Sequence, residues 1–432
     1  MMQKNNKDIL FYIETETQFD SLMPLLVYLR DSTKIDFDIV VPRALPKGAA
    51  LLEDVYNGGA AALKSRGFNV TRSVDGAILP DRIINTKYQL LLSAYIYPWH
   101  YQSLSVKYRI MFPYASYYFN KPHWTVEQFM NRDYLADALL SHAIGTKEVT
   151  DIFTTTHLVP SLKLMDFSKR QKNRAKPVLF FAPTYDEIGF AINFLQDIEA
   201  IKKEYTVIMR DHHRVSHVKS NKDIFEELHR KVDKVYDVDS YPIVTPLEEA
   251  SIVVSDNSAV IFDAIYCGVP VALFSQDPNA FHYRGINTAQ SELVKSGDIL
   301  WTDDPKKILN IVNETITPKM LKKQKEMRHK LFPNSTTSPV ARWMDVLSVY
   351  LENKLPDNYS LAKRYWIEKI NHQAAEDQMA SARIEGLKAL IKDYEDKVYS
   401  EAHPGVRTAT KRLVKACLYK LHILERGRNA KH

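Results

Sequence analysis

The chain has 432 residues, of which 45% are hydrophobic and 25% charged. This composition is typical of a packed protein and excludes a disordered one, and the length predicts two domains. The net charge of +6 is concentrated in residues 405–432, which hold eight Lys and Arg and one Glu, so the rest of the chain carries a net −1. A nearly neutral body argues against nucleic-acid binding.

The cysteines and the N-terminus predict a cytosolic protein. Cys267 and Cys417 lie far apart in the sequence, which suggests neither a disulfide framework nor a metal cluster. Met1–Lys7 is polar, and the apolar run Ile9–Ile13 is too short for a secretory signal or a membrane span.

Residues 8 to about 165 alternate between apolar strand-like runs and helical patterns. Asp20 or Ser21 is expected to cap a helix over Leu22–Arg30, and a second helix is expected around Ala49–Ser65. The strand-like runs are Asp8–Ile13, Phe37–Val41, Asn69–Val74, Tyr88–Ser93, Tyr108–Phe112 and Ala136–Ser141. Such alternation implies crossover units and a parallel sheet.

A polar, basic bridge over Ser168–Lys176 separates this half from a second one with the same alternation. The expected strands are Val178–Ala182, Thr206–Met209, Val235–Val238, Ile252–Val254, Val271–Phe274 and Ile299–Trp301; the expected helices are Phe190–Ile201, Asp223–Lys231 and Val260–Cys267. After Lys306 the pattern is helical. We predict an α/β protein of the GT-B layout, with Rossmann-like domains over 1–167 and 177–350 facing a cleft, and C-terminal helices over 351–432.

The segment Ile252–Asp263 contains the most informative motif. An apolar strand ends at Ser255, and small polar residues then begin a helix, whose free N–H groups and dipole favour an anion such as phosphate. Ser258 could add a hydroxyl contact. The alternative is an ordinary helix cap in a βαβ unit.

Several ordered motifs resemble the C-terminal half of the CDP-glycerol glycerophosphotransferase family, the teichoic-acid polymerase and primase type. Residues 255–263 (Ser-Asp-Asn-Ser-Ala-Val-Ile-Phe-Asp) are similar to that family's signature. Val178–Thr184 looks like its strand ending in Ala-Pro-Thr, Val207–His212 like its strand ending in Arg-x-His, and Asn334–Val346 like its closing helix. The resemblance covers about residues 170–350.

The resemblance implies a GT-B enzyme with a nucleotide-donor site in the second domain and an acceptor site in the first. By it, His212 matches the active-site histidine, and Arg210 beside it suits bidentate phosphate contact. The donor-binding residues would be Thr184, Ser255, Asp256, Asn257, Ser258 and Asp263. The alternative for the stretch Arg210–His217 is a solvated basic loop.

The first half departs from the family. After the strand ending at Phe112 the family has Trp-His-Gly-Thr, whereas this chain has Pro113-Tyr114-Ala115-Ser116. His100 and His123 lie nearby, and either could approach the cleft, but both are interpreted as structural histidines. Glu14, Glu16 and Asp20 follow the first strand, so one of them, Asp20 foremost, could be the base that deprotonates an acceptor hydroxyl.

No cofactor or metal is expected, because Asp237-Val238-Asp239 is only a weak match to a metal-binding pair. In the tail, Leu413, Cys417, Leu421 and Leu424 share one helical stripe flanked by cations. This pattern is typical of a helix lying on anionic lipid, so residues 405–432 predict a peripheral protein on the inner face of the cell membrane. The alternative is a helix packed on the body or on a partner subunit.

The leading hypothesis is a transferase of cell-envelope biogenesis, acting in teichoic-acid or capsule synthesis. It would move a glycerophosphate or sugar unit from a CDP-glycerol-like donor to a polysaccharide or lipid-linked acceptor. Two alternatives remain open at this point: a nucleotide-sugar epimerase or hydrolase of similar fold, and a catalytically degenerate nucleotide-binding scaffold.

Overall fold

A computed structural model describes most of the first 354 residues. The described residues are 6–43, 50–74, 78–96, 100, 103–113, 136–144, 155–168, 175–184, 190–212, 222–238, 241–256, 258–274, 282–283, 286–287, 289–333 and 337–354. All of them belong to the first of two compact units, Met1–Lys354. The charged helices and the basic tail predicted after residue 354 lie outside the described residues.

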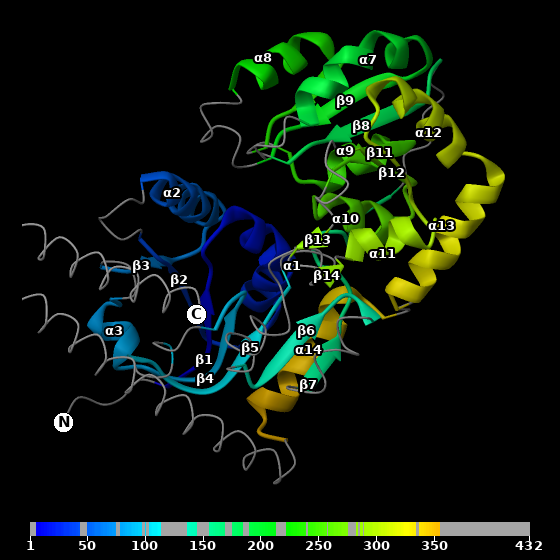
Figure 1. Ribbon diagram of the computed structural model, residues 1–432. Helices are drawn as coiled ribbons and strands as arrows, with labels where there is room; N and C mark the ends of the chain where they lie inside the picture. The colour runs from blue at the N-terminus through cyan, green and yellow to red at the C-terminus, as the bar shows by residue number, and fades with distance from the viewer. Residues whose placement is uncertain are drawn as a thin grey trace, which may run out of the picture. The chain divides into compact units, whose positions relative to one another are not determined.

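The first sheet is parallel and seven-stranded (Figure 1). Its strands are β1 (Asn6–Tyr12), β2 (Phe37–Val41), β3 (Val70–Arg72), β4 (Lys87–Ser93), β5 (Ser105–Met111), β6 (Ala138–Ser141) and β7 (Thr155–Leu158). The order is β3-β2-β1-β4-β5-β6-β7, so the direction of winding reverses between β1 and β4. Ligands of doubly wound folds bind beside the carboxyl ends of strands at such a reversal.

The helix after β1 begins earlier than predicted. α1 spans Glu16–Ser32, and the Thr15 side chain accepts a hydrogen bond from the Gln18 amide. The Gln18 side chain in turn accepts from the Glu14 amide at 2.7 Å. These two bonds fix the start of the helix, with Thr15 as its N-cap, so the prediction that Asp20 or Ser21 caps it was wrong. Asp20 instead lies inside α1, on its second turn. The other helices of this half are α2 (Ala50–Ser65) and α3 (Asp81–Ile84).

The second sheet is parallel and six-stranded, with the order β10-β9-β8-β11-β12-β15. Its strands are β8 (Val178–Ala182), β9 (Thr206–Arg210), β10 (Lys234–Tyr236), β11 (Ile252–Ser255), β12 (Val271–Phe274) and β15 (Leu300–Thr302). Its helices are α7 (Phe190–Glu204), α8 (Lys222–Lys231), α9 (Val244–Glu249), α10 (Val260–Tyr266), α11 (Ala289–Lys295), α12 (Ile308–Thr315) and α13 (Pro318–Leu331). A short antiparallel pair, β13 (His282–Tyr283) and β14 (Ile286–Asn287), lies apart from this sheet. The winding reverses between β8 and β11.

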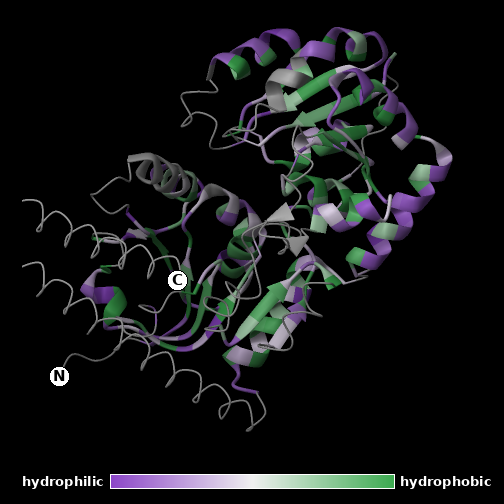
Figure 2. Cartoon of the chain, viewed as in Figure 1, coloured by the Kyte–Doolittle hydropathy of each residue, from purple (hydrophilic) through white to green (hydrophobic). Residues whose placement is uncertain are grey.

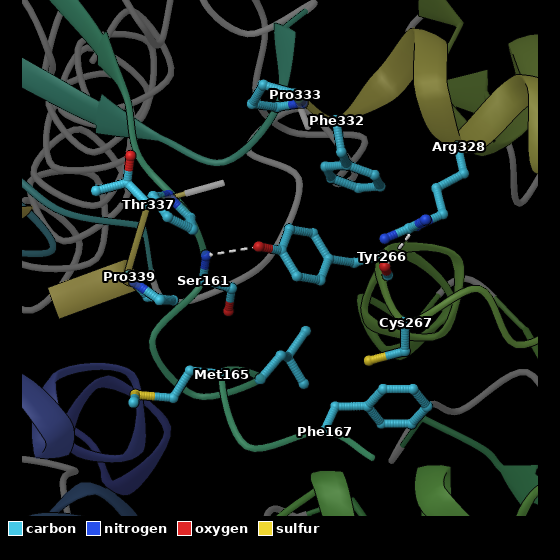
Figure 3. A pocket seen from close by; sticks show the side chains of 12 residues that line it. Ser161, Met165, Phe167, Tyr266, Cys267, Arg328, Phe332, Pro333, Thr337 and Pro339 are labelled. Atoms are coloured by element: carbon cyan, nitrogen blue, oxygen red, sulfur yellow. Dashed lines mark hydrogen bonds between the residues drawn. The ribbon is translucent and has the colours of Figure 1, made fainter. Parts of the chain in front are cut away.

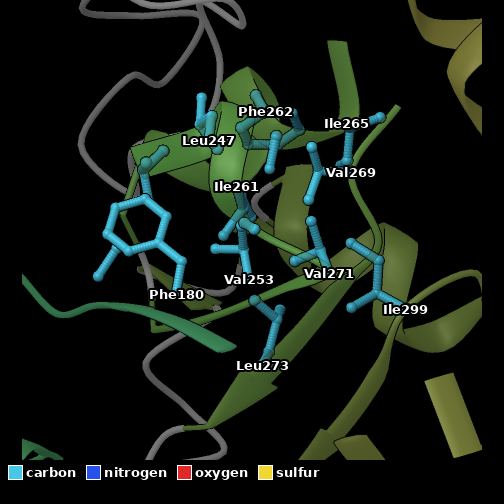
Figure 4. Close-up of a cluster of buried hydrophobic side chains, with 14 of the residues drawn as sticks. Phe180, Leu247, Val253, Ile261, Phe262, Ile265, Val269, Val271, Leu273 and Ile299 are labelled. Atoms are coloured by element: carbon cyan, nitrogen blue, oxygen red, sulfur yellow. The ribbon is translucent and has the colours of Figure 1, made fainter. Parts of the chain in front are cut away.

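The central strands β8, β11 and β12 of the second sheet are buried on both faces, as their continuous apolar runs predict. Phe180 and Val253 point into a cluster with α9 and α10 (Figure 4), whereas Leu179 and Val254 point into a second cluster with α7, α8 and α12. Hydrophobic residues accordingly concentrate along the strands, and the helices are more polar on their outer sides (Figure 2). The sheet therefore provides a rigid base for the loops at its carboxyl edge.

The last described helix, α14 (Pro339–Leu351), packs against strands of the first sheet. The indole of Trp343 is fully buried and donates to the Pro160 carbonyl at 2.9 Å. Near the other end, the Tyr350 carbonyl accepts from the Gln89 side chain at 2.9 Å, and the Tyr350 hydroxyl lies 2.7 Å from His157 Nε2. The chain thus crosses between the two halves twice. The domain limits at residues 167, 177 and 350 stay predictions.

Candidate active site

The predicted donor residues of β8 and β11 meet at the reversal point of the second sheet. Ser255 pairs with Ala182 in the register, and its buried hydroxyl donates to the Ala182 carbonyl at 2.6 Å. One residue further, Asp256 Oδ2 accepts from the Thr184 amide at 3.0 Å and from the Thr184 hydroxyl at 2.7 Å. These bonds fix the two loops to each other at the edge where the fold favours a ligand. Asn257 lies outside the described residues.

The helix after β11 begins at its predicted first residue, Val260. α10 begins at Val260, and the hydroxyl of Ser258 accepts from the Val260 amide at 3.4 Å. Ser258 is half-buried, and this bond places its hydroxyl beside the first turn of the helix. The first amides of α10 follow directly from the loop that carries Asp256, so their partial positive charge lies at the carboxyl edge of the sheet.

Asp263, in the first turn of α10, forms a buried ion pair. Its carboxylate lies 2.6 Å from the Lys163 ammonium, and the two side chains are 4% and 12% exposed. Lys163 belongs to the stretch between β7 and β8, so this pair joins that connection to the helix. The lysine partner was not predicted from sequence, because a hundred positions separate the two residues.

The end of β9 presents a cation that the backbone holds in place. The Arg210 guanidinium donates to the carbonyls of Val238 and Tyr241, both at 3.2 Å. His212 follows two residues later and is half-buried. Between them, Asp211 accepts from His229 Nε2 of α8 at 2.8 Å, and this hydrogen bond raises the pKa of His229. Arg210 is the last residue of β9, and β9 neighbours β8, the strand that leads into Thr184. His213, Arg214 and His217 lie outside the described residues.

Asp20 of α1 lies in the electrostatic field of the second half. Burial raises the pKa of its carboxyl group above the ordinary value, and the positive charges of Arg210, Lys163 and Arg66 partly oppose that rise. The structure therefore brings Asp20 within electrostatic range of Arg210 and of the Lys163–Asp263 pair. A carboxylate with a raised pKa is a better proton acceptor than a solvated one, which is the property a general base needs.

Two histidines of the first half are buried and neutral. Burial lowers the pKa of His100 to about 3, and its ring packs edge-on against Tyr12 with centroids 5.0 Å apart. Burial likewise lowers the pKa of His142, at the end of β6, to about 4; its Nδ1 lies 2.9 Å from the Val159 carbonyl. These contacts favour structural roles. His142 was missed by sequence reasoning, and His123 and Glu16 have no described side chain.

Within the ranges given above, no three His, Cys, Asp or Glu side chains gather as they would around a metal ion. Over the same ranges, no helix has both the length and the apolarity needed to cross a bilayer.

The fold and this edge define the class of protein. Two parallel, doubly wound sheets, with polar groups at the reversal point of the second, are the arrangement of GT-B glycosyltransferases and related epimerases. Residues 165–330 match the model of a family described as CDP-glycerol:poly(glycerophosphate) glycerophosphotransferase. The resemblance seen in the motifs is therefore confirmed for this part of the chain, and with it an enzyme of GT-B, glycosyltransferase type.

Solved structures show the same fold at low sequence identity. The wall teichoic acid polymerase TagF is 11% identical with a TM-score of 0.54, and the match covers 81% of this chain and 90% of that one. A histidine variant of TagF soaked with CDPG is 11% identical with a TM-score of 0.55, and the match covers 81% of this chain and 90% of that one. The UDP-GlcNAc 2-epimerase from Neisseria meningitidis bound to UDP-GlcNAc is 13% identical with a TM-score of 0.50, and the match covers 79% of this chain and 99% of that one. A comparison with curated protein sequences found no match.

Proposed function

We propose that this enzyme transfers a glycerophosphate or sugar unit from a CDP-glycerol-like donor to a surface-polymer or lipid-linked acceptor. One observation carries the proposal: Thr184, Asp256 and the start of α10 meet at the reversal point, and Arg210 ends the neighbouring strand. The match of residues 165–330 to the glycerophosphotransferase family supports the choice of donor.

The reaction needs a proton acceptor and a stabiliser of phosphate charge. In the proposed step, an acceptor hydroxyl attacks the phosphorus that carries the glycerol, a new P–O bond forms, and the P–O bond to the departing CMP breaks. Asp20 takes the hydroxyl proton. The charge that develops on the departing phosphate is stabilised by the first amides of α10 and by the side chains of Arg210 and His212.

Arg210 is suited to this role because its guanidinium is positioned before any ligand arrives. Two backbone carbonyls hold it through Nε and Nη2, so little side-chain freedom is lost on binding. Asp20 is suited to its role because burial raises the pKa of its carboxyl while Arg210 stays close enough to act on it.

The decisive experiment measures CMP release from CDP-glycerol by the full chain, with and without an oligomeric glycerophosphate acceptor. We expect release that depends on the acceptor, and a loss of about 100-fold in kcat for Arg210→Gln. The matched control is Arg230→Gln, which removes an exposed arginine from α8 and should leave kcat unchanged.

Other outcomes would replace the proposal. Turnover of a nucleotide donor without acceptor would favour the epimerase or hydrolase, and binding without turnover would favour the degenerate scaffold. A transferase that accepts only a sugar nucleotide would leave the fold assignment intact and change the donor class.

We further propose that residues 405–432 attach the enzyme to the anionic inner face of the cell membrane, next to a lipid-linked acceptor. Their seven net positive charges and single apolar stripe support this. Flotation with phosphatidylglycerol vesicles tests it: the full chain should float, and a chain ending at Pro404 should not. Equal flotation of both would contradict the proposal.

A further inference from the structure

A cavity of about 300 Å³ lies at the C-terminal end of α10 (Figure 3). Its lining residues come from three parts of the chain: the connection after β7, the end of α10, and the end of α13 with the start of α14. They are Pro160, Ser161, Leu164, Met165, Phe167, Tyr266, Cys267, Arg328, Phe332, Pro333, Thr337 and Pro339. Both connections between the two sheets therefore contribute to it. This volume lies at the lower end of the range for small-molecule sites.

The cavity contains a hydroxyl that lacks a hydrogen-bond partner among the described residues. Ser161 is 1% exposed, and no described atom bonds to its Oγ. Its amide donates to the Tyr266 hydroxyl at 3.1 Å, as the dashed line in Figure 3 shows. Burial raises the pKa of Tyr266, so its phenol keeps a proton to donate. A buried hydroxyl without a partner costs about 1–3 kcal/mol, which a ligand atom bonded to it would recover.

Arg328 supplies a positive charge to the same cavity. Its Nε donates to the Tyr266 carbonyl at 2.7 Å, which leaves the two terminal nitrogens of the guanidinium without a partner in the described part of the chain. Figure 3 shows the guanidinium beside Tyr266. A fixed guanidinium with free terminal N–H groups matches the paired oxygens of a phosphate or carboxylate.

Apart from Thr337, the remaining lining side chains are apolar or uncharged. Phe332 packs edge-on against Tyr266 with centroids 5.2 Å apart, and Met165 and Phe167 lie across the cavity from it. Burial raises the pKa of the Cys267 thiol, which therefore stays neutral and adds no negative charge. The cavity thus combines the cation of Arg328 and the hydroxyls of Ser161, Tyr266 and Thr337 with aromatic surface.

We propose that this cavity binds a small organic phosphate ester, whose phosphate contacts Arg328, Ser161 and Tyr266 and whose apolar part packs on Phe332. The occupant is distinct from the nucleotide donor of the proposed reaction. α10 has seven residues, so its two ends are about 10 Å apart. The donor phosphates belong to the N-terminal end and this ligand to the C-terminal end.

Isothermal titration of the full chain with phenyl phosphate tests the proposal directly. We expect measurable binding to the wild type, binding at least about ten times weaker for Arg328→Gln, and about three to ten times weaker for Ser161→Ala, as the loss of a charged and a neutral hydrogen bond predicts. The matched control is Lys330→Gln, which removes the same charge from an exposed position of α13 and should bind as the wild type does.

Ser161→Ala keeps the test valid if Arg328→Gln fails to fold, because the Ser161 hydroxyl forms no hydrogen bond to a described residue. Three results would overturn the proposal: no binding of phenyl phosphate, equal binding by wild type and Ser161→Ala, or inorganic phosphate binding as tightly as phenyl phosphate. Competition with CDP-glycerol would also overturn it, since the ligand would then occupy the donor site. None of these results depends on turnover, so the proposed reaction can fail while this site stands.

Discussion

Removing Lys163 should destabilise the protein far more than removing a surface lysine. Lys163→Met removes the ammonium group that neutralises the carboxylate of Asp263, at a position where that side chain is 4% exposed. Breaking a buried pair from one side typically costs about 3–5 kcal/mol, because the remaining charge has lost both water and its counterion. The double variant Lys163→Met with Asp263→Leu removes that charge as well, so it should recover most of the loss.

Urea unfolding followed by far-UV circular dichroism measures these changes. Lys231→Met is the control: its partner Glu227 lies 3.2 Å away but both side chains are exposed by more than a third, so it should cost less than about 1 kcal/mol. A loss below about 1 kcal/mol for Lys163→Met would refute the reasoning, since it would mean that water reaches Asp263. A double variant no more stable than the single one would refute it too.

Three further predictions concern a base, a titrating pair and a buried indole. Asp20→Asn should lower kcat at least about 100-fold if Asp20 is the base. The same variant should be more stable than the wild type at neutral pH. The raised pKa of Asp20 stabilises the fold fully only below its ordinary value of 3.8, and that contribution is lost as pH rises through the raised pKa. Activity assays and melting curves at pH 7.5 check both, and a Tm below the wild type's would contradict the second. The raised pKa of His229 stabilises the fold below about pH 6.5, and this contribution is lost as pH rises through that pKa. Asp211→Asn removes the hydrogen bond to His229 and should therefore flatten the fall of Tm between pH 6 and 9. An unchanged Tm profile would argue against this hydrogen bond. Trp343→Phe removes the donor to the Pro160 carbonyl and should lower the free energy of unfolding in urea by about 1–3 kcal/mol. An unchanged free energy of unfolding would contradict this prediction.

The fold was predictable because its signals are local. Runs such as Val178–Ala182 and Val271–Phe274 are apolar throughout, as strands buried on both faces must be, and they were predicted with their exact bounds. The start of α1 was misplaced because several residues that could cap a helix follow one another there. Thr15 is the N-cap, since its side chain accepts a hydrogen bond from the Gln18 amide. β7 was missed because Thr155–Leu158 is short and three of its four residues are polar, and α9 because it has only six residues.

The site was only partly predictable from sequence. Asp256 was predicted because it follows an apolar strand, and Thr184 because it stands at the end of a motif that resembles the family's; the strand order then brings the two together. Lys163 was missed because nothing near it in sequence indicates that Asp263 is its partner. The fixed position of Arg210 depends on two carbonyls of the loop after β10, which is also a tertiary contact. The roles of His212, Ser258 and the other predicted site residues stay predictions.

The return of α14 to the first sheet determines how the protein can be divided into fragments. A fragment that ends near residue 167 would expose the surface that Trp343 and Tyr350 bury, and would lose the bonds of α14 to Pro160 and Gln89. A fragment of residues 177–350 would carry α14 with no partner for its apolar side. Separate expression of the halves therefore requires residues 338–354 to be joined by a linker to the N-terminal fragment, which makes α14 a natural place to split the chain for complementation.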